Sequence, residues 1–260
     1  MKTIWINPNL LAWEMEWESQ AQLPQRSSNL AYSMWSHADL LVREHKSPLH
    51  TVDAIMTLKR ACDVRLKHLN RIYHFDRLKD PAYPKHLIQQ LEFWGIIRSH
   101  LVRKLLNIRN AVEHGHTRPP KQADCAELVE FVWYFLKATD AKVSMKHDVV
   151  GLSSPHIPRN YYMSFTIQPS WCIALRGWLR PSMIDMDAHA GWTKAVLVSK
   201  ETRAHLIQRE NKNNRKPTPI QNILDERGIN PEDLFVDCIL EPKTASDAII
   251  KFGKAYFALN

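Results

Sequence analysis

The chain has 260 residues, of which 45% are hydrophobic and 24% are charged. These values are ordinary for a globular protein and allow one large domain or two small ones. No apolar run reaches the length needed to cross a bilayer, and the first residues do not read as a signal peptide, so we expect a cytoplasmic protein with no membrane partner. The formal net charge of +8 and the isoelectric point of about 9.3 favour anionic partners, nucleic acid first.

The first half of the chain has the composition of helices, with no glycine before Gly95. Apolar residues recur at helical spacing over 28–46 and again over 49–75, and these segments are predicted to be helices. Further helices are predicted over 85–94, through the apolar positions from Ile96 to Ile108, and over 122–138.

The composition changes near residue 142. Short apolar runs separated by proline and polar turns, such as YYMSFTI, WCIALRGWL and WTKAVLVS, are typical of strands joined by loops. Residues 208–219 are polar, basic and end in proline, so a loop is expected there. A short helix, a strand-bearing piece and a terminal helix are expected after it.

These segments predict a mainly α protein. We expect an N-terminal arm over 1–27, a bundle of four to five helices over 28–142, and a smaller α+β domain over 143–260. The four cysteines are far apart and form no C-x-x-C pair, and the histidines are scattered. We therefore expect buried, reduced thiols, no metal and no cofactor. The cysteines are Cys62, Cys125, Cys172 and Cys238.

The most informative stretch is IRNAVEHGH, residues 108–116. Arg109 can hold the negative charge of a phosphate, and His114 can transfer a proton near neutral pH. Asn110 is predicted to orient the histidine or the phosphate. Glu113 either fixes the tautomer of the imidazole or is a solvated residue at the helix end. His116 also satisfies a broader spacing from Arg109, so it is an alternative to His114 or a supporting residue.

With its Arg-Asn-x-x-x-His form and the helices on either side, this stretch resembles the motif of the HEPN superfamily. The resemblance covers roughly residues 28–140 as a layout of helices, and only the motif and its flanks are specific. It implies a helical bundle that pairs with a second copy, so that two motifs face one another in a composite cleft. Members with an intact motif are commonly metal-independent endoribonucleases, and many act as toxins or phage-defence effectors.

The expected reaction is attack of the RNA 2'-hydroxyl on its own phosphate, which leaves a 2',3'-cyclic phosphate. The expected partners are RNA, a second copy of the chain, and an antitoxin or regulatory protein. The alternative is a non-catalytic helical dimer that binds a nucleotide, RNA or a protein. Weaker candidates for nucleic-acid contact are Arg176, Arg180, Arg209, Arg215 and Lys216. Three tryptophans, Trp171, Trp178 and Trp192, either stack on bases or pack in the core.

Overall fold

The computed structural model describes residues 2–98, 100, 103–104, 106–107, 110, 120–155, 162–213 and 220–258. Contacts within the chain divide it into two compact units. The helical unit contains residues 21–76 and 81–146, and the sheet unit contains residues 1–20, 77–80 and 147–260. The sequence analysis instead divided the chain at residues 27 and 142.

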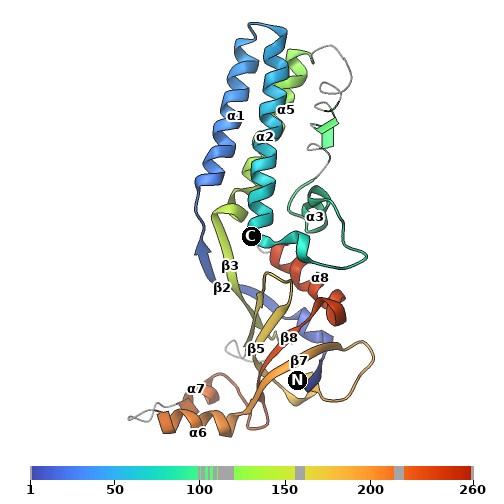
Figure 1. Cartoon of the computed structure of the whole chain (residues 1–260). Helices are drawn as coiled ribbons and strands as arrows, with labels where there is room; N and C mark the ends of the chain where they lie inside the picture. The colour runs from blue at the N-terminus through green and yellow to red at the C-terminus, as the bar shows by residue number, and fades with distance from the viewer. Residues whose placement is uncertain are drawn as a thin grey trace. The chain divides into compact units, whose positions relative to one another are not determined.

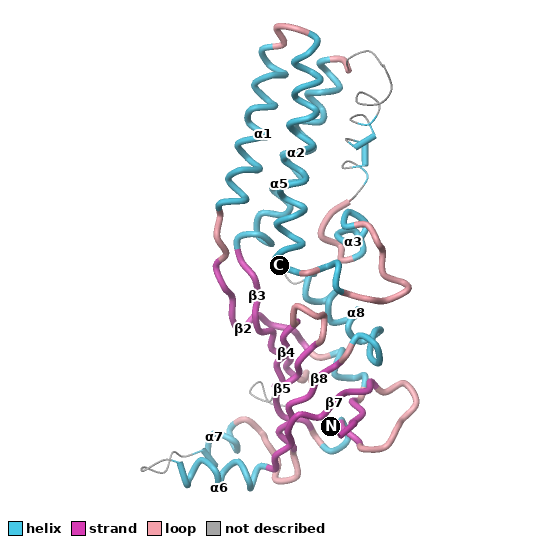
Figure 2. Tube along the Cα trace, in the orientation of Figure 1, coloured by secondary structure: helices cyan, strands magenta, loops and turns pink. Residues whose placement is uncertain are grey.

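Three long helices form the centre of the helical unit: α1 (Arg26–Glu44), α2 (Pro48–Tyr73) and α5 (Gln122–Ser144). Each contacts the other two, and they run alongside one another in Figures 1 and 2. A shorter helix, α3 (Leu87–Phe93), contacts α2. The apolar stripes predicted from the sequence supply the core, which includes the fully buried Ile55, Leu58, Leu69, Leu128 and Leu136.

The sheet unit is built on eight strands in the order β2-β3-β4-β5-β8-β7-β1-β6. The pairs β3–β4, β4–β5, β5–β8, β8–β7, β7–β1 and β1–β6 are all antiparallel. The strands are β1 (Lys2–Ile6), β2 (Glu14–Gln22), β3 (Met145–Ser153), β4 (Tyr162–Ile167), β5 (Ile173–Leu179), β6 (Ile184–Asp185), β7 (Thr193–Thr202) and β8 (Leu234–Leu240). The 3-10 helices η1 (Pro8–Ala12), η2 (Phe75–Arg77) and η3 (Pro181–Met183) complete the connections.

The prediction of a mainly α helical bundle was wrong, because the described residues form an α+β fold with seven α-helices and an eight-stranded sheet. Strands at both ends of the long helices account for the difference. β2 is a polar edge strand without a buried face, and β3 follows α5 directly, with no glycine or proline to mark the boundary. β2 does alternate polar and apolar residues from Glu14 to Glu18, a signal that the sequence analysis missed, whereas the boundary between α5 and β3 carries no breaker residue.

The C-terminal helix α8 (Pro242–Ala258) contacts β7 and β8, and Phe252 packs against Phe165 of β4 with ring centroids 4.9 Å apart. At the other end of the sheet, Trp17 of β2 stacks on His147 of β3 at 3.4 Å, and the Tyr256 hydroxyl donates to the His147 carbonyl. Trp171 and Trp178, two of the candidate base-stacking residues, are buried in the core. Aromatic packing thus joins the sheet and α8 into one core.

Two short helices follow β7 in the sheet unit. α6 (Arg203–Asn213) covers the first part of the segment predicted as a loop over 208–219, so that prediction was wrong as far as residue 213. α7 (Ile220–Glu226) is the short helix expected from the sequence. In the part of the chain that the structure describes, no helix is long and apolar enough to cross a membrane.

Candidate functional site

Most of the predicted catalytic motif lies outside the described residues. Arg109, Glu113, His114 and His116 are among the residues that the structure does not describe, and so are Arg215 and Lys216. Asn110 is described: it is helical and exposed. The predicted pairing of Arg109 with His114 therefore stays a prediction.

The described residues on either side of the motif belong to the helical unit. On the N-terminal side, Lys104 forms an ion pair with Glu127 of α5 at 2.8 Å. On the C-terminal side, the Gln122 side chain at the start of α5 donates to the carbonyl of Val42 near the end of α1 at 2.8 Å. Both flanks are thus attached to the same set of helices, α5 on one side and α1 on the other.

The weaker arginine candidates lie on different elements. Arg176 is exposed on β5, and its guanidinium lies over the Phe235 ring, 5.6 Å from the centroid. Arg180 precedes η3, and Arg209 of α6 forms an ion pair with Glu201. Because a carboxylate already neutralises Arg209, it is a weaker phosphate contact than the sequence suggested.

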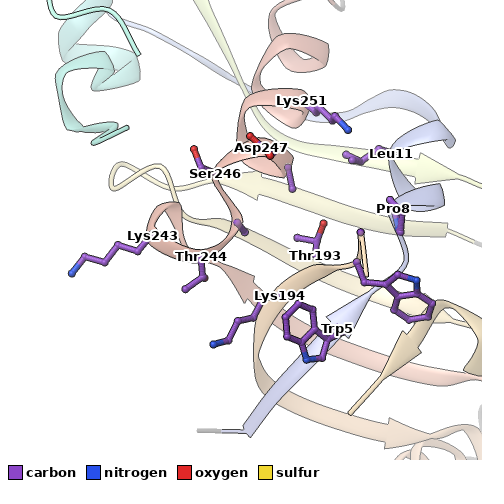
Figure 3. Close-up of a pocket in the computed structure, with 14 residues that line it drawn as sticks. Trp5, Pro8, Leu11, Thr193, Lys194, Lys243, Thr244, Ser246, Asp247 and Lys251 are labelled. Atoms are coloured by element: carbon purple, nitrogen blue, oxygen red, sulfur yellow. The ribbon is translucent and has the colours of Figure 1, made fainter. Parts of the chain in front are cut away.

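A pocket of about 580 Å³ lies in the sheet unit, and its lining residues were not predicted from the sequence to lie together. It is lined by residues of β1, η1, the turn before β7, β7 itself and the start of α8 (Figure 3). The side chains with recognisable chemistry are two indoles, three ammonium groups, three hydroxyls and one carboxylate. They belong to Trp5, Trp192, Lys194, Lys243, Lys251, Thr193, Thr244, Ser246 and Asp247.

Strand pairing positions one side of this pocket. Trp5 of β1 lies opposite Lys194 of β7 in the antiparallel ladder, so the two residues share one face of the sheet. The turn that leads into β7 contains Gly191 at φ +79, a left-handed conformation that suits glycine. Trp192 follows directly, and its indole packs against the His189 imidazole with ring centroids 4.6 Å apart. The turn therefore supplies the Trp192 indole and the His189 imidazole that packs against it.

A short contact holds that imidazole in place. His189 Nε2 lies 2.6 Å from Asp185 Oδ2, and this hydrogen bond is the main reason that the pKa of the Asp185 carboxyl is lowered. Asp185 also pairs with Trp5 across the β1–β6 ladder. The aromatic residues of the pocket are thus connected through the Asp185–His189 pair.

The pocket carries an excess of positive charge. In the described part of the chain, Lys194, Lys243 and Lys251 take part in no ion pair, and Asp247 is the one carboxylate among the lining residues. Figure 3 shows Lys194 and Lys243 extending on the same side of the pocket, whereas Lys251 lies near Leu11. An anionic ligand would therefore find lysines that pair with no carboxylate among the described residues.

Sequence reasoning missed this site, apart from naming Trp192 as a residue that either stacks on bases or packs in the core. Its lining residues come from three distant parts of the chain, near residues 5–11, 191–194 and 243–251. The one local signal is the sequence Trp192-Thr193-Lys194, which places an aromatic ring and a cation two residues apart. That signal is too short to distinguish a binding site from a strand.

No cluster of metal-ligating residues accompanies either candidate among the described residues, where no group of three or more histidine, cysteine, aspartate or glutamate side chains could hold an ion. Cys62, Cys125 and Cys238 are buried and Cys172 is half-buried, and all four are free thiols. In comparisons with known proteins, no family model, no curated protein and no solved structure matches the chain. The resemblance to the HEPN superfamily therefore rests on the sequence motif alone.

Proposed function

We propose that the chain is a metal-independent endoribonuclease whose reaction is carried out by Arg109 and His114. The observation that carries the proposal is the Arg109-Asn110-x-x-x-His114 sequence, whose described member Asn110 is helical and which precedes α5 in the chain. The net charge of +8 supports an anionic substrate.

The chemistry requires no group beyond these side chains and the RNA. The 2'-hydroxyl loses its proton and forms a bond to the adjacent phosphorus, and the bond to the 5'-oxygen breaks when that oxygen receives a proton. His114 moves the proton, and the Arg109 guanidinium stabilises the charge on the phosphate oxygens. The products are a 2',3'-cyclic phosphate and a 5'-hydroxyl. Asn110 is the described member of the set, and its exposure leaves it accessible to substrate.

The proposal includes a second copy of the chain. Exposed leucines near the turn between α1 and α2 support such a contact: Leu40 is 51% exposed and Leu49 is 66% exposed. Val42, which binds the start of α5, lies between them in the sequence. A paired arrangement would bring two motifs to one cleft, and an antitoxin or regulatory protein would act by blocking or releasing that cleft.

The first prediction concerns the two catalytic side chains. Arg109→Ala and His114→Ala should each lower the rate of RNA cleavage in EDTA by about 100-fold or more, because one removes charge stabilisation and the other proton transfer. The readout is gel analysis of a labelled RNA, with mapping of the ends for a cyclic phosphate. Arg98→Ala and His100→Ala are matched controls, because both residues are exposed and lie just before the motif.

Mixing the two inactive variants tests the second copy. If each composite cleft uses groups from both chains, a mixed dimer retains one Arg109 and one His114 and should recover part of the activity. Full cleavage by both single variants would overturn the site. Normal cleavage by a protein that stays monomeric in light scattering would overturn the pairing. RNA binding without cleavage would leave the non-catalytic module as the function.

A further inference from the structure

We propose that the pocket between β1, β7 and the start of α8 binds a nucleotide, that is, a phosphate monoester of a sugar that carries an aromatic base. This site is in the sheet unit and uses none of the residues assigned to RNA cleavage, so it stands or fails independently of the proposed function. Its volume of about 580 Å³ lies in the range of small-molecule sites, roughly 300–1,000 Å³.

The charge of the pocket selects a phosphate. Three ammonium groups and one carboxylate line it, which leaves an excess of two positive charges, the difference between three and one. Lysine is a common phosphate ligand, and an ion pair with phosphate gives strong, charge-assisted hydrogen bonds. Because none of these lysines has a carboxylate partner among the described residues, binding a phosphate breaks no existing ion pair.

The start of α8 is already occupied by a protein carboxylate. Ala245 has non-helical angles, φ −137 and ψ 31, so the regular part of the helix begins at Ser246, and the Ser246 hydroxyl donates to the Asp80 carboxylate. The Thr244 hydroxyl donates to the Glu241 carbonyl at 3.5 Å. The lysines, rather than the helix end, therefore carry the preference for phosphate, and the hydroxyl of Thr193 in the same lining can donate to a phosphate oxygen.

The aromatic side chains select the rest of the ligand. Trp5 and Trp192 line the pocket and are only partly buried, so their indoles keep surface on which a planar ring can stack. The His189 imidazole supports Trp192, and Asp185 holds the imidazole by a 2.6 Å contact, so the indole has a fixed position before a ligand arrives. Stacking of bases on such residues is tolerant of base identity. The site should therefore bind nucleotides with different bases about equally, and it should bind ligands without a phosphate much more weakly.

A free nucleotide and the 5'-phosphorylated end of an RNA chain both present a phosphate beside a base, so either could be the ligand. Calorimetric titration of the full chain with AMP, adenosine and inorganic phosphate tests the shared chemistry. A short RNA with a 5'-phosphate, and the same RNA with a 5'-hydroxyl, test the polymer. The His114→Ala protein is used for all titrations, so that RNA is not cut if the proposed function is correct.

We expect AMP to bind at least about tenfold more tightly than adenosine or inorganic phosphate, since each of these lacks half of the contacts. The double variant Lys194→Ala/Lys243→Ala should weaken AMP binding by about tenfold or more. The matched control is Lys67→Ala/Lys85→Ala, which removes two exposed lysines of the helical unit and should leave AMP binding unchanged. Trp192→Ala should weaken AMP but not inorganic phosphate.

Each outcome decides a part of the proposal. An RNA end is the ligand if 5'-phosphorylated RNA binds more tightly than both AMP and the 5'-hydroxyl RNA and if Lys194→Ala/Lys243→Ala removes that advantage. Equal binding of the two RNAs, with AMP binding lost in the lysine variant, identifies the free nucleotide. Equal losses in the pocket variant and the Lys67/Lys85 control would show only general attraction to a basic protein and overturn the site. AMP affinity unchanged in both lysine and Trp192 variants, with folding verified by circular dichroism, would overturn it as well.

Discussion

One buried cation of the helical unit and two pocket cations of the sheet unit are in opposite situations. In the helical unit, the Arg65 guanidinium of α2 is fully buried and bound to Asp140 of α5. In the sheet unit, Lys194 and Lys243 line a pocket and have no ion pair among the described residues. A buried cation must be neutralised from within the protein, whereas an unneutralised cation at a pocket can serve a ligand. The comparison separates a structural charge from a binding charge.

The Arg65 network joins the three long helices. The guanidinium donates to oxygens of α1 and α5, namely Ser28 Oγ at 3.2 Å, the Leu136 carbonyl at 3.2 Å, Thr139 Oγ1 at 3.2 Å and Asp140 Oδ1 at 3.0 Å. The Tyr32 hydroxyl of α1 donates to the other Asp140 oxygen at 2.6 Å. Burial, followed by this bond to Asp140, raises the pKa of Tyr32 above its usual range. One guanidinium thus sets the mutual register of the helices.

Removing that charge should have the largest effect on stability. Arg65→Ala leaves buried acceptors without donors and a void, so the free energy of unfolding should fall by about 3–5 kcal/mol. Urea unfolding followed by circular dichroism measures it. Arg43→Ala is the control, because Arg43 pairs with Asp39 at 2.7 Å on the surface with its side chain 75% exposed, and its loss should cost less than about 1 kcal/mol.

Arg65→Met sharpens the same test. A methionine fills much of the volume but makes no hydrogen bonds, so a smaller loss than in Arg65→Ala would assign the difference to the void. Equal losses in Arg65→Ala and Arg43→Ala would contradict the structural role of the buried charge.

Burial also gives two single groups, one in each unit, opposite pH dependence. Burial lowers the pKa of Lys142 in α5 from 10.5 to about 8, and it raises the pKa of Cys238 in β8 from 9.0 to about 12. Between pH 8 and 10.5 the unfolded chain binds more protons at Lys142, so this group adds stability as the pH rises. Between pH 9 and 12 the folded chain retains the Cys238 proton whereas the unfolded chain releases it. This group therefore lowers the stability of the folded protein as the pH rises.

Two variants separate these slopes. In Lys142→Met, the free energy of unfolding should rise less with pH than in the wild type. In Cys238→Ala, it should fall less with pH than in the wild type. Each difference in slope should be no more than about 1.4 kcal/mol per pH unit. Urea unfolding at pH 8, 9 and 10 provides the measurement. A wild-type difference from either variant that stays constant with pH would show that the group titrates alike in both states.

The sequence predicted the long helices and four of the strands well, and it missed the other strands. The runs YYMSFTI, WCIALRGWL and WTKAVLVS and the strand-bearing piece that follows α7 are confirmed as β4, β5, β7 and β8. α2 was expected over 49–75 and spans Pro48–Tyr73, because its apolar residues recur every three or four positions and need no distant partner to be recognised. β1 has only Ile4 and Ile6 fully inward, and its place between β6 and β7 depends on residues some 180 positions away. Such pairing leaves no local pattern.

The same distinction holds for the candidate sites. The motif around Arg109 is contiguous, so it can be read from nine letters of sequence. The pocket joins Trp5, Trp192 and Lys243, and only the strand register and the path into α8 bring them together. Nothing near any one of these residues indicates the other two, which is why the pocket required a structure.

The smallest expected effect concerns the edge of the sheet, where tight contact involves a flexible side chain. A Cβ at Gly151 of β3 would lie 2.6 Å from Glu18 Oε1 of β2, but that carboxylate ends an exposed side chain that can rotate away. Because alanine is also favoured over glycine within a strand by about 0.5–1 kcal/mol, Gly151→Ala should change the free energy of unfolding by less than about 1 kcal/mol. In a Glu18→Ala background the same change should become stabilising. If Gly151→Ala lowered the free energy of unfolding by more than about 2 kcal/mol, the Glu18 side chain would not be free to rotate away. The contrast between the fixed Arg65 and the flexible Glu18 would then be wrong.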